Sequence, residues 1–97
     1  MEVKTIAVIG AGIMGRGIAQ VAALGGFDTI LNDISEKLLE SSLKQIERDM
    51  QQGVERGKLT PEKMAQGLKS LSVSADLKEL GARADLVIEA VPEKIDL

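Results

Sequence analysis

Short apolar runs alternate along this chain with longer stretches in which apolar side chains recur every three or four positions. The short runs are rich in β-branched and aliphatic residues and predict four strands, at residues 3–9, 29–32, 71–74 and 85–90. The stretches with helical spacing predict helices at residues 13–24, at 35–56, from 60 onward and at 76–80. Regular alternation of strand and helix is typical of an α/β fold with a parallel sheet.

The predicted helix at 35–56 is longer than a crossover helix needs to be. Ser35 stands at its N-cap position, and its apolar stripe is Leu39, Leu43, Ile46, Met50 and Val54. At the helical rise it spans roughly 33 Å, whereas a short strand spans under about 20 Å. We expect the excess to protrude from the sheet as a helical hairpin, the second helix starting at Thr60 and Pro61. The hairpin is either a stray insertion or a binding arm for something larger than a cofactor.

A glycine-rich turn follows the first strand, with the sequence Gly10, Ala11, Gly12, Ile13, Met14, Gly15. Gly10 permits a tight turn, Gly12 lets the backbone approach a pyrophosphate, and Gly15 lets the following helix pack close to the strand. The N–H groups of the first helical turn then face the phosphates. Asp33 directly follows the second strand, where it can accept hydrogen bonds from the adenosine ribose. These features together predict a dinucleotide-binding site.

The cofactor predicted from these residues is NAD. Asp33 accepts a hydrogen bond from a ribose 2′-hydroxyl but repels a 2′-phosphate, and no arginine adjoins it in the sequence.

Right-handed crossovers order four such strands 3-2-1-4. The first and fourth strands then flank the crevice, so Ala90, Val91 and Glu93 should lie across it from the glycine-rich turn. The fold class is a partial Rossmann doubly wound sheet, and residues 1–97 are expected to be a single truncated NAD-binding domain without its C-terminal half. The fourth strand would be an exposed edge, so the chain is either truncated or self-associated, and a homo-oligomer is expected.

Composition excludes several classes of function. The net charge of −3 argues against nucleic acid as a partner, because phosphate backbones need clustered lysine and arginine. No apolar stretch has the length of a membrane span, and no secretory pattern opens the chain. Cysteine and histidine are absent, which removes disulfides, thiolate metal sites and the commonest metal ligand. We therefore expect a cytoplasmic protein with no metal and no membrane contact.

Two charged residues have more than one interpretation. Glu89 lies within an apolar strand, where it is either a perturbed functional acid or a cap for a neighbouring loop. Arg16 follows the last glycine of the turn and either reaches the pyrophosphate or belongs to a solvated helix surface.

Three segments resemble the 3-hydroxyacyl-CoA dehydrogenases, in particular the bacterial 3-hydroxybutyryl-CoA dehydrogenases: residues 9–20, 31–35 and 84–93. The long helix followed by Gly57, Lys58, Leu59 and Thr60 also fits the family's spacing. The resemblance covers the whole chain, and its motifs agree in order and separation. It implies an NAD-dependent oxidoreductase of fatty acid and lipid metabolism that interconverts 3-hydroxyacyl-CoA and 3-ketoacyl-CoA.

The resemblance also assigns residues. It implies that the glycine-rich turn, with Ile13 and Met14, binds the phosphates, that Asp33 binds the adenosine ribose, and that Glu93 lies beside the nicotinamide. The family's two coenzyme A contacts, a serine and a lysine, fall at Asp49 and Arg56. Arg56 suits a phosphate, whereas Asp49 departs from the pattern.

The resemblance implies that the family's catalytic residues lie downstream of Leu97, in a part that includes a separate helical domain. They comprise a histidine, the glutamate that orients it, and a serine and an asparagine that contact substrate. Oxidation of a secondary alcohol needs a base, and this chain offers only carboxylates and lysines. We therefore expect no catalytic residue among the 97, and a chain that binds NAD and acyl-CoA without turnover.

Two alternatives remain open. A different 3-hydroxyacid dehydrogenase would share the G-x-G-x-M-G turn, but the long helix and Asp33 fit it less well. A non-enzymatic NAD-sensing or minimal nucleotide-binding module would explain the missing catalytic residues, but three motifs match a catalytic family.

Overall fold

The computed structural model describes residues 2–90 of the 97. Its elements, in chain order, are β1 (Thr5–Ile9), α1 (Ile13–Leu24), β2 (Asp28–Asn32), α2 (Glu36–Glu55), α3 (Pro61–Ser70), β3 (Leu71–Ser74), α4 (Leu77–Arg83) and β4 (Leu86–Glu89). Each predicted strand and helix is present. The predicted end of the last helix was wrong, since α4 continues to Arg83, where the guanidinium pairs with Glu79 one turn earlier at 2.7 Å.

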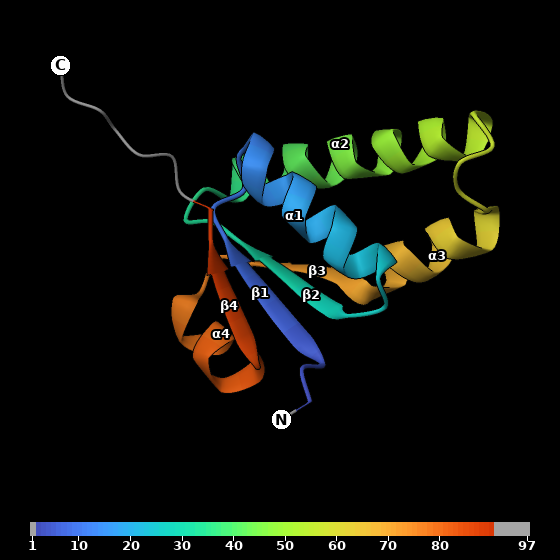
Figure 1. Ribbon diagram of the computed structural model, residues 1–97. Coiled ribbons are helices and arrows are strands. Elements are labelled where there is room, and N and C mark those ends of the chain that lie inside the picture. Colours follow the sequence, from blue (N-terminus) through green and yellow to red (C-terminus); the bar gives the residue numbers. More distant parts are fainter. Residues whose placement is uncertain (1, 91–97) are drawn as a thin grey trace, which may run out of the picture.

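The four strands form one parallel sheet in the order β3-β2-β1-β4, which confirms the predicted topology. Ile9 is in register with Asn32 on one side and with Glu89 on the other. The strands therefore end in line, and the residues after them meet at one edge of the sheet. Helices α1, α2 and α3 cover one face and α4 covers the other (Figure 1).

The core is aliphatic and lies on both faces of β1. Ala7 and Val8 have no exposed surface, and these adjacent side chains point to opposite faces of the strand. Val8 packs in the larger cluster with α1 and α2, whereas Ala7 packs with Ile30 and Leu80 beneath α4. Burial on both faces is why β1 reads as a continuous apolar run.

The hairpin formed by α2 and α3 extends past the end of α1 (Figure 1). The buried residues of α2 are Leu39, Ser42, Ile46 and Met50, whereas Leu43 and Val54 are only half-buried. Leu39, Ile46 and Met50 of the predicted stripe are thus buried, whereas Leu43 and Val54 lie at its margin. Ser42, which the stripe did not include, is buried because α2 meets the glycine-rich turn on that side.

Helix α3 anchors the hairpin to the rest of the domain. The Gln66 side chain donates a hydrogen bond to the Ala23 carbonyl at the end of α1. A β-carbon added at Gly67 would lie 2.8 Å from Leu24 and 3.3 Å from Met50. Glycine at position 67 thus allows α3 to pack closely against both α1 and α2.

Asp85, just before β4, ties the start of β1 to that strand. Its Oδ2 atom accepts hydrogen bonds from the backbone amides of Lys4 and Thr5, at 2.9 and 3.0 Å. These two bonds lower the pKa of the Asp85 carboxyl below its ordinary value of 3.8.

This geometry predicts a pH-dependent contribution to stability. The folded state favours the charged Asp85, so the contribution is present above the unfolded-state pKa and is lost as pH falls through the lower, folded-state pKa. We expect Asp85→Ala to lower the urea midpoint at neutral pH and the difference from the unmutated chain to shrink in acid. Asp28→Ala, at an exposed position of β2, is the control. A difference that stays constant down to about pH 2 would contradict the assignment.

Candidate functional site

The glycine-rich turn joins β1 to α1 at the carboxyl edge of the sheet. Gly10 has φ +102°, a conformation that strongly favours glycine, and its amide donates to the Asn32 carbonyl at 2.8 Å. A β-carbon added at Gly15 would lie 1.6 Å from the Gly10 carbonyl oxygen and 3.6 Å from the β-carbon of Ala90. The start of α1 is thus pressed against the ends of both β1 and β4.

Gly12 is the N-cap of α1 and leaves the first turn of the helix open. A β-carbon added at Gly12 would meet nothing within 4 Å, and no side chain caps the helix. The N–H groups of this turn lack intrahelical partners, and the helix dipole adds positive potential there. The arrangement suits an anion such as a pyrophosphate, which can approach the backbone at Gly12.

Asp33 follows β2 and is held beside the turn by two backbone amides. Its Oδ2 atom accepts from Ala11 at 3.0 Å, and its Oδ1 atom accepts from Ser35 at 2.9 Å. Each carboxylate oxygen can accept a further hydrogen bond. The half-buried Asp33 therefore retains capacity for a pair of ligand hydroxyls.

A hollow of about 290 Å³ opens next to Asp33, lined by Ile9, Gly10, Asn32, Asp33, Ile34 and Leu77. Ile34 is 87% exposed and Leu77 is 55% exposed, so two aliphatic side chains face solvent beside a carboxylate. Such a hollow suits a flat aromatic base whose ribose reaches Asp33. Sequence reasoning missed both residues; the only signal was an apolar residue directly after Asp33 and another directly after the Asp76 helix cap.

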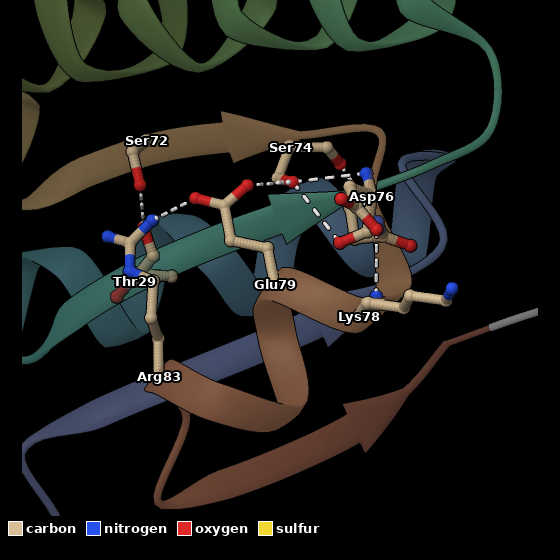
Figure 2. Close-up of polar contacts among 8 residues, drawn as sticks. Thr29, Ser72, Ser74, Asp76, Lys78, Glu79 and Arg83 are labelled. Carbon is tan, nitrogen blue, oxygen red and sulfur yellow. Dashed lines mark hydrogen bonds and ion pairs between the residues drawn. The ribbon is translucent and has the colours of Figure 1, made fainter.

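Polar contacts join the end of β3 to the start of α4, the helix in which Leu77 is the first residue (Figure 2). The Ser74 hydroxyl accepts from the Asp76 amide and donates to the Glu79 carboxylate, each at 3.1 Å. The buried Asn32 amide group donates to the Ser74 carbonyl at 2.9 Å. Asp76 also caps α4 through the Lys78 amide. The first turn of α4 is therefore fixed relative to β2.

Other predicted residues lie apart from this site or outside the described part of the chain. Arg56 is the exposed C-cap of α2 on the hairpin, and Asp49 on the same helix accepts from Gln45 at 3.0 Å. Ala90 is buried against Gly15, whereas Val91 and Glu93 lie outside the described residues.

The structure shows where Glu89 and Arg16, the two charged residues with more than one interpretation, lie. Glu89 lies in the fourth strand, as predicted, as the last residue of β4, and its side chain is exposed, because β4 is the outer strand of the described sheet. Arg16 is half-buried on α1, one turn after Gly12.

A larger hollow of about 670 Å³ lies along α1, lined mainly by aliphatic side chains that include Met14, Val21 and Ile88. Its near lack of polar groups makes it unsuitable for phosphates or ribose. Within residues 2–90, no three acidic residues cluster as metal ligands would. Over the same span, none of the helices combines the length and apolar character needed to cross a bilayer.

The whole described site falls within a match to a known family. A sequence model of the NAD-binding domain of 3-hydroxyacyl-CoA dehydrogenases matches residues 5–97. The chain belongs to this family. This NAD-binding domain is 44% identical, over its full length, to 3-hydroxyadipyl-CoA dehydrogenase of Escherichia coli, of which it covers 20%. It is 39% identical over 98% of its length to a probable 3-hydroxybutyryl-CoA dehydrogenase of Bacillus subtilis, of which it covers 33%.

Solved structures agree with the sequence match. The NAD-binding domain superposes on a 3-hydroxybutyryl-CoA dehydrogenase from Escherichia coli with a TM-score of 0.92 and 46% identity, covering 97% of this chain and 20% of that one. The M. tuberculosis protein FadB2 gives 0.91 at 33% identity, with 97% of this chain and 33% of that one covered. The domain thus spans between a fifth and a third of these relatives, and its cofactor is NAD.

Proposed function

We propose that this chain is the NAD-binding part of a dehydrogenase that interconverts 3-hydroxyacyl-CoA, in particular 3-hydroxybutyryl-CoA, and 3-ketoacyl-CoA in fatty acid metabolism. The observation that carries the proposal is the arrangement of Asp33 beside an open glycine-rich turn, with both carboxylate oxygens held by backbone amides. The proposed reaction and substrate are taken from the family match and from the names of the relatives.

Different residues are proposed to bind the phosphates, the adenosine and the nicotinamide of NAD. Gly10, Ala11, Gly12, Ile13, Met14 and Gly15 form the phosphate-binding turn. Asp33 would accept hydrogen bonds from the adenosine ribose, and the hollow lined by Ile34 and Leu77 would hold the adenine. Ala90, Val91 and Glu93 are proposed to contribute to the nicotinamide half of the site, on the strength of their place after the fourth strand in the sequence and of the family resemblance. NAD, when bound, accepts a hydride from the carbon that bears the substrate hydroxyl.

The hairpin is proposed to meet the coenzyme A part of the substrate. Arg56 is exposed at the end of α2 and offers a guanidinium to a phosphate. Asp49 does not suit that role, because its carboxylate would repel the phosphate.

The whole protein is proposed to be a cytoplasmic homo-oligomer. Leu86 and Val87 on β4 are 44% and 46% exposed, an apolar strand surface of the kind that other chain segments or copies cover. The lack of cysteine fits a reducing compartment, where disulfides are rare.

A titration of the 97-residue chain with NADH tests the proposal directly. Binding is followed by the change in nicotinamide fluorescence, which is excited at wavelengths that protein side chains do not absorb. We expect saturable binding of NADH and, because no histidine is present, no oxidation of NADH in an absorbance assay with acetoacetyl-CoA. Absence of NADH binding would refute the proposal, and turnover would show that the chain contains a residue able to donate the proton that the reduced ketone takes up.

A further inference from the structure

Ser42 is a polar residue on the buried face of α2. It is 1% exposed and lies in line with Leu39 and Ile46. A serine within a helix commonly donates to a carbonyl of the preceding turn, as the neighbouring Ser41 does to Leu38 at 3.1 Å. The Ser42 hydroxyl instead donates to the carbonyl oxygen of Ala11, which lies in the glycine-rich turn.

The peptide groups on either side of the Ala11 α-carbon are therefore held by side chains. Ala11 has no exposed surface, its amide donates to Asp33, and its carbonyl accepts from Ser42. Buried backbone polar groups need such partners, and here both come from segments that follow β2. The peptide between Ala11 and Gly12 therefore has its orientation set by Ser42.

We propose that Ser42 is a positioning residue for the dinucleotide site. It acts through the Ala11 carbonyl, holding the turn so that Gly12 and the first-turn amides of α1 keep their direction toward the phosphates. This inference rests on the proposed function, since it assumes that the turn binds a pyrophosphate. It also fixes the turn to α2, the same helix that carries Arg56 at its far end.

Measuring the binding of ADP and of adenosine separates the effect of Ser42 on phosphate binding from any effect on adenosine binding. Adenosine reaches Asp33 and the hollow beside it but lacks the phosphates, whereas ADP also engages the turn. By calorimetry we expect Ser42→Ala to weaken ADP binding about fivefold or more, because a buried carbonyl loses its donor. Adenosine binding should stay unchanged. Ser41→Ala, which removes an exposed hydroxyl on the same helix, should change neither.

Several results would overturn the inference. Unchanged ADP binding would show that the turn does not depend on Ser42. An equal loss of ADP and adenosine binding, together with a lower melting temperature, would show a purely structural role. If the unmutated chain binds neither ADP nor NADH, the proposed function fails and the inference fails with it.

If Ser42→Ala does not fold, two variants of nearly equal shape, with threonine or valine at position 42, test the same role. Ser42→Thr keeps a hydroxyl, and Ser42→Val replaces it with a methyl group of similar size. We expect the threonine variant to bind ADP more tightly than the valine variant while the two bind adenosine equally. Equal behaviour toward both ligands would refute the role of the hydroxyl.

Discussion

Gly15→Ala should abolish NAD binding and destabilise the domain. An ideal β-carbon at this position lies 1.6 Å from the Gly10 carbonyl oxygen, which is backbone and cannot rotate away. Accommodation requires α1 to move off the ends of β1 and β4, which opens the turn. We expect the free energy of unfolding to fall by about 3 kcal/mol or more, measured by urea denaturation.

Gly17→Ala is a matched control on the same helix. A β-carbon at Gly17 meets nothing within 4 Å, so the substitution adds only helix propensity. It should raise stability by about 0.5–1 kcal/mol and leave NADH binding unchanged. If the two alanine variants behaved alike, the close approach at Gly15 would not determine the site.

Asp33→Ala should weaken NAD binding by about 1–3 kcal/mol, because the ribose hydroxyls lose their acceptor. The unmutated chain should prefer NAD to NADP, since the carboxylate would face a 2′-phosphate. Asp33→Asn removes the charge that would repel a 2′-phosphate, so it should reduce the preference for NAD over NADP. Because its amide NH2 would face the N–H of either Ala11 or Ser35, NAD binding should also weaken. Calorimetric titration with both cofactors measures each effect.

Asp28→Ala controls for loss of a carboxylate on the same strand. Asp28 is exposed at the start of β2, at the opposite end from Asp33. Its substitution should leave both cofactor affinities unchanged. Equal affinity of the unmutated chain for NAD and NADP would rule out the role assigned to Asp33.

These predictions depend on residues that the sequence already marked. The roles of Gly10 and Gly15 could be predicted from the sequence. A tight turn from a strand into a helix needs glycine at the first position, and close packing of that helix on the strand needs glycine at the last. The strand order could be predicted as well, since right-handed crossovers leave few arrangements for strands connected in this way. The position of Ala90 beside Gly15 follows from that order.

The sequence was less informative about side chains whose environment is set by distant segments. Helical spacing made Leu43 the natural stripe residue, yet Ser42 is the buried one, because its hydroxyl finds the Ala11 carbonyl.

The sequence by itself determined the elements, their order in the sheet and the residues that allow a phosphate to approach the backbone, because these depend on local conformation and chain connectivity. Only the tertiary structure brought Ile34 and Leu77 together around one hollow. The same is true of the hydrogen bonds that hold Ala11 between Asp33 and Ser42. Such contacts join residues far apart in the chain, and no periodicity within one segment encodes which partner a side chain meets.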